Sequence, residues 1–202
     1  MKSAMKLNVL GVGASMREES YSTATLKIIL ERVSKNEAET KLLDLRLTRL
    51  PMLYSTKDGA EELIHATELV KWADAFILST PDYHGSMSAP IKNFLDHFWS
   101  EFAGKIFGYI IASHEKGLTA MDQMRTAIRQ CYGWSMPYGI SINPEEDFDD
   151  SGNLVSEKLS NRVDMVARDL VVYGKLIRQQ FVNDLTQKNV VNSFASYYKK
   201  NE

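Results

Sequence analysis

Residues 75–94 read AFILSTPDYHGSMSAPIKNF and decide the fold. They begin with a continuous apolar run, 75–79, which fits a strand buried on both faces of a parallel sheet. A loop rich in Pro, Gly and hydroxyl side chains follows, and Pro90 stands where a helix can begin. From Pro90 to Phe102 the apolar residues recur at intervals of three and four, which predicts a helix. The stretch is therefore a strand–loop–helix unit.

The same unit repeats along the chain. Short apolar runs predict five strands, at residues 7–12, 41–45, 75–79, 106–112 and 138–142. Segments with helical spacing predict the other helices, at residues 26–33, 63–73, 118–131 and 156–181. This alternation predicts a doubly wound α/β protein, a three-layer α/β/α sandwich whose five-stranded parallel sheet has the order 2-1-3-4-5. Its ligand crevice lies where the winding reverses, outside the carboxyl ends of strands one and three.

Length and charge exclude several classes of protein. The chain has 202 residues and a formal net charge of −2, with 25% charged and 44% hydrophobic residues, which suits one globular domain. A near-zero charge argues against nucleic-acid and anionic-membrane partners. Apolar runs are far shorter than the ~20 residues of a membrane span, and the single cysteine, Cys131, demands no oxidising compartment. We therefore expect a cytoplasmic protein.

The loop after the first predicted strand, residues 13–23, reads GASMREESYST and precedes a helix. The free N–H groups and the dipole of a helix N-terminus favour an anion, and Arg17 can bind phosphate oxygens bidentately. The loop therefore predicts a site for a terminal phosphate. The alternative is a simple capping cluster, since Ser22 or Thr23 would cap the helix in any protein.

Other phosphate-handling classes do not fit this loop. A dinucleotide fingerprint would need a glycine where Met16 stands, and a Walker loop would need Gly-Lys followed by Ser or Thr. A phosphatase with a cysteine here is excluded, because Cys131 lies elsewhere. A response regulator would carry acidic residues at the end of the first strand, where this chain has Gly13 and Ala14.

The loop after the third predicted strand can line a flat heteroaromatic ring. Gly85 lets the backbone approach a ring closely, Tyr83 offers an aromatic face, and loop amides can bond ring nitrogens and carbonyls. Taken alone, the loop would be a turn with a helix cap. Beside a phosphate site at the same switch point, it predicts a mononucleotide site.

These two loops resemble those of the NAD(P)H-dependent FMN reductases. Ser15-Met16-Arg17 followed by Ser20 and Ser22 resembles the family's phosphate loop, and residues 80–86, TPDYHGS, followed by Lys92-Asn93, resemble its ring-binding loop. The likeness extends from about residue 7 to about residue 181 and implies a flavodoxin-like fold. It implies an enzyme that passes hydride from NADPH or NADH to FMN and on to a small acceptor: free flavin, a quinone, an azo compound or a metal oxyanion.

The resemblance also implies site residues. The FMN phosphate would be held by Ser15, Arg17, Ser20, Ser22 and Thr23. The isoalloxazine ring would be bordered by Pro81, Asp82, Tyr83, His84, Gly85 and Ser86. The family usually has Asn where this chain has His84, and its glycine-rich loop after strand four here reads SHEKG, from which Ser113, His114 and Gly117 are the candidate contacts. Imidazole or charged groups in this loop would stabilise the anionic reduced flavin and raise its potential.

The remaining expectations concern the rest of the chain. No two histidines have metal-ligand spacing, so we expect no metal site, and hydride transfer to a flavin requires no catalytic side chain. Residues 1–181 would form the FMN-binding domain, with a possible interruption of the last helix at Gly174. The apolar tail, residues 182–202, would pack on the body or on a neighbouring subunit, and the resemblance implies a homodimer or homotetramer. A non-enzymatic electron carrier and a flavin-binding sensor remain the alternatives.

Overall fold

A seven-stranded sheet forms the centre of the computed structural model, which describes residues 6–55, 59–187 and 192–201. Its main path runs β2-β1-β3-β5-β6, and neighbouring strands along it are parallel. The strands of this path are β1 (Leu7–Gly13), β2 (Ala38–Asp44), β3 (Ala75–Tyr83), β5 (Ile106–Ala112) and β6 (Trp134–Ser135). The predicted fold class is confirmed, because this is the flavodoxin-like order 2-1-3-4-5.

Two short strands lie off that path and correct the predicted boundaries. β4, at Ser86–Met87, pairs antiparallel with the end of β3, so β3 runs four residues beyond the predicted 75–79. β7, at Ile140–Ile142, pairs with β5 beyond β6, so the fifth strand predicted at 138–142 begins two residues later, and β6 lies before it where no strand was predicted. Pro137 lies between β6 and β7, and a proline has no N–H for the ladder.

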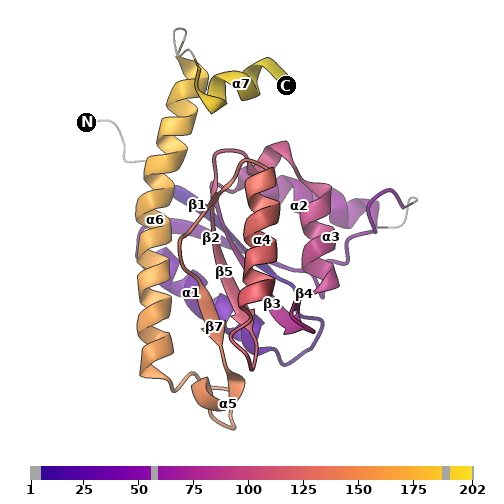
Figure 1. Cartoon of the computed structure of the whole chain (residues 1–202), viewed down its shortest axis with the longest axis vertical. Helices are drawn as coiled ribbons and strands as arrows, with labels where there is room; N and C mark the ends of the chain where they lie inside the picture. Colours follow the sequence, from indigo (N-terminus) through magenta and orange to yellow (C-terminus); the bar gives the residue numbers. More distant parts are fainter. Residues whose placement is uncertain (1–5, 56–58, 188–191, 202) are drawn as a thin grey trace.

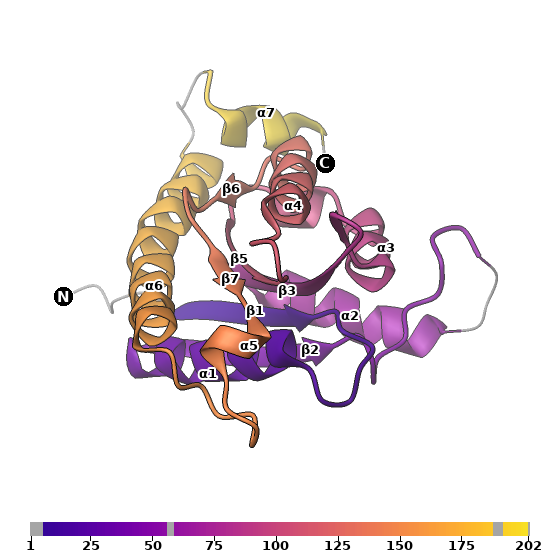
Figure 2. The ribbon, with the colours of Figure 1, turned by 60° about the horizontal axis from the view of Figure 1, so that its bottom comes forward.

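Helices cover both faces of the sheet (Figure 2). α1 (Tyr21–Lys35) and α6 (Glu157–Thr186) pack on one face with the side chains of Leu7, Val9 and Ile77. α2 (Ala60–Trp72), α3 (Ala89–His97) and α4 (Leu118–Gln130) pack on the other, with those of Leu10, Val12 and Leu78. The central strands β1, β3 and β5 are buried on both sides, which explains their continuous apolar sequence, whereas the edge strand β2 exposes part of its length.

The third predicted helix ends earlier than its apolar spacing indicates. α3 stops at His97, and a 3-10 turn, η1 (Ser100–Phe102), continues the segment. Phe98 and Phe102 are still buried, so the spacing records burial of side chains and not one unbroken helix. Trp99, which shares this apolar spacing, is 67% exposed.

α6 is continuous across Gly174, contrary to the expected interruption (Figure 1). A Cβ at this glycine would stand 2.8 Å from Leu7 Cδ2, so Gly174 serves the close approach of helix and sheet. The helix also crosses the predicted domain limit at residue 181.

The C-terminal segment packs on the body of the same chain, at the end of the molecule opposite β4 and the short helix α5 (Pro144–Asp147) (Figure 1). Phe194 of α7 (Phe194–Asn201) stacks on Tyr132 with ring centroids 4.5 Å apart, and the Tyr198 hydroxyl donates to the Ser100 carbonyl at 3.1 Å. Val190 and Val191, part of the predicted apolar tail, lie outside the described residues.

Candidate functional site

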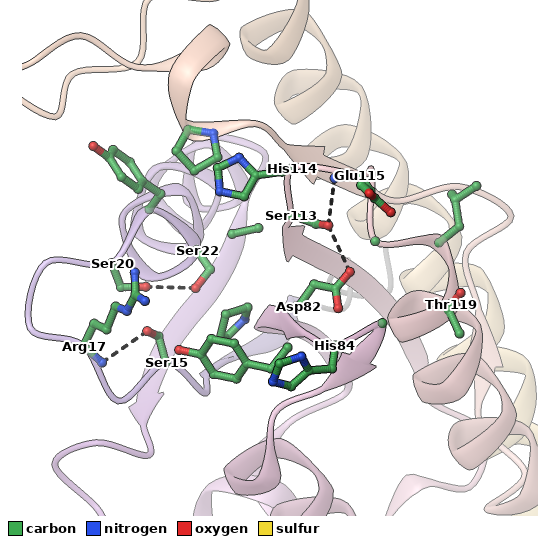
Figure 3. A pocket seen from close by; sticks show the side chains of 18 of the residues that line it. Ser15, Arg17, Ser20, Ser22, Asp82, His84, Ser113, His114, Glu115 and Thr119 are labelled. Carbon is green, nitrogen blue, oxygen red and sulfur yellow. Dashed lines mark hydrogen bonds between the residues drawn. The ribbon is translucent and has the colours of Figure 1, made fainter.

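A cavity of about 710 Å³ lies at the carboxyl ends of β1, β3 and β5, a size typical of small-molecule sites (Figure 3). Twelve of the fourteen predicted site residues line it: Ser15, Arg17, Ser20, Ser22, Pro81, Asp82, Tyr83, His84, Gly85, Ser113, His114 and Gly117. The cavity thus lies at the edge of the sheet that the switch-point rule indicates.

One wall of the cavity is the loop that leads into α1. Ser20 caps this helix, with its Oγ accepting from the Thr23 N–H at 3.3 Å, so the predicted cap at Ser22 or Thr23 is wrong. The Oγ atoms of Ser20 and Ser22 lie 2.9 Å apart, and Ser15 Oγ accepts from the Arg17 N–H. Hydroxyls, a helix N-terminus and a guanidinium are thus gathered at one end of the cavity.

The hairpin between β3 and β4 forms a second wall. Tyr83 pairs with Ser86, which leaves His84 and Gly85 as a two-residue turn with φ of +57° and +72°. Two successive left-handed residues make the type I′ hairpin turn, for which Asn-Gly is the favoured pair. Histidine also tolerates this backbone better than most residues, so His84 suits the first position of the turn.

The third wall is the loop after β5. Ser113 Oγ donates to Asp82 Oδ2 at 2.9 Å, joining the ends of β3 and β5. Gly117 adopts φ +58°, and a Cβ there would lie 2.3 Å from Ile111 Cγ2, so the start of α4 requires glycine. His114 lies at the solvent side, with its Nδ1 3.9 Å from Glu145 Oε1.

The two other predicted residues face elsewhere. Thr23 does not line the cavity. Ser86 Oγ donates to Gln123 Oε1 at 2.9 Å and lines a separate, shallow hollow between α3 and α4.

Seven lining residues were not predicted: Glu19, Tyr21, Ala112, Glu115, Leu118, Thr119 and Pro144. Glu19, Tyr21 and Glu115 belong to the loops that the sequence indicates as binding loops. A predicted site that included every residue of those loops would have contained them. Pro144 begins α5. Its neighbours in the sequence do not indicate a binding site, because Pro144 reaches the cavity only through the path of the chain after β7.

The donor set of the cavity fits a phosphorylated flat ring. Arg17 and the hydroxyls offer several donors to phosphate oxygens, at a helix N-terminus that favours negative charge. The opposite side offers the aromatic face of Tyr83, open backbone at Gly85 and acceptor oxygens at Asp82. Within the described residues, no group of His, Cys, Asp and Glu is arranged to hold a metal ion, and no helix is long and apolar enough for a bilayer.

Comparison with known proteins supports this chemistry. The sequence model of the family "NADPH-dependent FMN reductase" matches residues 7–146. The chain is 31% identical to an NADPH azoreductase of Bacillus sp. (strain OY1-2) over 57% of this chain and 67% of that protein. It is 28% identical to an FMN-dependent NADPH-azoreductase of Staphylococcus aureus (strain USA300), over 66% and 75% respectively.

Among solved structures, the fold is similar to that of FerB, a flavoenzyme NAD(P)H:(acceptor) oxidoreductase from Paracoccus denitrificans. The TM-score is 0.68 at 18% identity, covering 85% of this chain and 98% of that one. At this identity the likeness concerns the fold alone.

Proposed function

Because the chain belongs to the NADPH-dependent FMN reductase family, we propose that the cavity at the ends of β1, β3 and β5 is its FMN site. The protein is an NAD(P)H-dependent FMN oxidoreductase, with NADPH or NADH as the hydride donor. The observation that carries the site assignment is the gathering of phosphate donors and a ring-sized hairpin wall around one cavity.

In this proposal each wall of the cavity has one task. Arg17 and the hydroxyls of Ser15, Ser20 and Ser22 hold the phosphate, and the α1 N-terminus adds its free N–H groups. Residues 81–85 border the ring, while Ser113 and Gly117 support it from the end of β5. Thr23 and Ser86 have no direct role.

The bound flavin supplies the redox chemistry, taking hydride from the nicotinamide and giving electrons to an acceptor. The residues of the chain bind the flavin, fix its orientation and leave one ring face open to the two substrates in turn. Hydride transfer needs no side-chain acid, base or nucleophile, so no residue is assigned such a role.

The acceptor in this proposal is a small oxidised aromatic molecule. An azo compound is the preferred candidate, and a quinone is the next. Both relatives described above are azoreductases, which favours an azo compound. Free flavin and metal oxyanions are the other acceptors to test.

One experiment separates the reductase from an electron carrier and from a sensor. Purified protein is loaded with FMN and mixed anaerobically with NADPH or with NADH, and an azo dye or quinone is then added. Bleaching by a nicotinamide followed by repeated turnover supports the reductase. Bleaching by dithionite but by neither nicotinamide would reject it, in favour of a carrier or a sensor.

A cytoplasmic location and a homodimer or homotetramer complete the proposal. Analytical ultracentrifugation at micromolar concentration tests the assembly, and a monomer would reject it.

A further inference from the structure

Asp82 has a carboxylate oxygen that the described part of the chain leaves without a partner. Its Oδ1 is buried from solvent and accepts no hydrogen bond there, whereas its Oδ2 accepts one from Ser113 Oγ. A buried carboxylate oxygen that has lost water without gaining a donor costs free energy. Asp82 lines the cavity while this oxygen is shielded from solvent, so water screens the charge of the carboxylate poorly.

The carboxylate is fixed in direction. The backbone of Asp82 is paired with Met87 in the β3–β4 ladder. Ser113, which donates to the carboxylate, is itself held by two bonds: its N–H donates to the Ile142 carbonyl at 2.9 Å, and its Oγ accepts from the Glu115 N–H at 3.2 Å. Asp82 therefore cannot easily turn its charge toward solvent.

The charges around the cavity are divided between its two sides (Figure 3). Arg17 is the one Lys or Arg among the described lining residues, and it stands with Glu19 on the α1 side. On the β3–β5 side stand Asp82 and Glu115, with the imidazoles of His84 and His114. A group bound beside Asp82 is thus close to a fixed negative charge and has no guanidinium or ammonium next to it.

Building on the proposed function, we infer that Asp82 lowers the reduction potential of the bound flavin. The poorly screened charge of its carboxylate opposes the charge that the ring gains. A hydride carries two electrons and one proton, so its transfer leaves NAD(P)⁺ on the donor and one added negative charge on the flavin. A fixed carboxylate disfavours that charged form relative to the oxidised one and makes the flavin a stronger electron donor.

The test is the midpoint potential of the FMN-loaded protein, measured by anaerobic reduction in equilibrium with a reference dye. Asp82→Asn keeps the size of the side chain and removes its charge. We expect reduced FMN to gain at least tenfold in affinity over oxidised FMN, which raises the two-electron potential by about 30 mV. Ser113→Ala frees the carboxylate to turn away and should shift the potential in the same direction by less, which provides a second variant should Asp82→Asn fold poorly.

Glu115→Gln is the matched control, because Glu115 is a carboxylate in the same cavity but exposed to solvent. Water screens its charge, so its potential should move less than that of Asp82→Asn. An unchanged or lower potential in Asp82→Asn, or an equal shift in Glu115→Gln, overturns the inference. The proposed function fails separately, through wild-type protein that binds no FMN or that neither nicotinamide bleaches.

Discussion

Lys105 is a buried lysine whose cost to the fold depends on pH. It is 5% exposed, its Nζ donates to the Val70 carbonyl at 2.9 Å, and the Phe76 ring lies 5.6 Å from it. Burial and, after it, the positive charge of Arg178 lower the pKa of Lys105 from 10.5 to about 8, against the opposing charges of Asp74 and Glu101.

The sign and size of the effect follow from this shift. A difference of 10.5 − 8, about 2.5 pKa units, corresponds to about 3 kcal/mol at 1.36 kcal/mol per unit. Below pH 8 both the folded and the unfolded chain carry the proton, so the folded state bears the whole cost. As the pH rises from about 8 toward 10.5, the folded chain releases its proton first, and the free energy of unfolding increases.

Cys131, Tyr109 and Tyr138 oppose this rise at the upper end of the window. Burial raises the pKa of each above its ordinary value, 9.0 for the thiol and 10.0 for the phenols, so near and above those pH values the unfolded chain ionises first and the gain in stability is reduced. Between pH 7 and pH 10 we therefore expect about 2 kcal/mol of the Lys105 cost to be recovered.

Urea denaturation of the FMN-free protein at several pH values between 7 and 10 measures this rise. Lys105→Met should remove most of it. The lost bond to Val70 lowers stability at every pH alike, so the slope is the observable and not the stability itself. Lys71→Met, which removes an exposed lysine, should keep the wild-type slope. If Lys105→Met retained the full rise, the assignment to Lys105 would be refuted.

Three further predictions concern the cavity. Arg17→Ala should weaken FMN binding by about 1.5–3 kcal/mol, the range for a hydrogen bond to a charged group. Fluorescence titration with FMN measures this loss, and an unchanged Kd would contradict the prediction. Gly117→Ala should lower the free energy of unfolding by more than about 1 kcal/mol, because its left-handed backbone and the contact with Ile111 both exclude a methyl group; a wild-type urea midpoint would disprove it. His84→Asn should stabilise the hairpin turn by a few tenths of a kcal/mol, and His84→Val should destabilise it. Thermal melting of the two variants measures the order, and a Val variant that melts above the Asn variant would contradict it.

Much of the fold was predictable because the sheet is buried on both faces. Residues 106–112 were predicted with the bounds that β5 has, since a doubly covered strand is apolar at successive positions. The cavity followed from topology, because the carboxyl ends of neighbouring parallel strands meet at one edge.

The missed features depend on contacts between distant residues. β3 reaches Tyr83 only because Ser86 and Met87 fold back to pair with it, and the local sequence reads as a loop. Gly174 suggests a helix break until its contact with Leu7, at the other end of the chain, is known. The hydrogen bond from Ser113 to Asp82 likewise joins the loop after β5 to the end of β3, which no spacing in the sequence reveals.

The division of charge across the cavity also determines which way a ligand can bind. A phosphate placed among the α1 hydroxyls meets Arg17 and the helix N-terminus, which both favour negative charge. The same phosphate turned toward β3 and β5 would meet the carboxylates of Asp82 and Glu115, and like charges repel strongly where one of them is buried. An uncharged flat ring placed beside Asp82 meets no such repulsion. In the proposed site, the residue that opposes reduction of the flavin therefore also prevents its reversed binding, so Asp82→Asn should weaken both effects together.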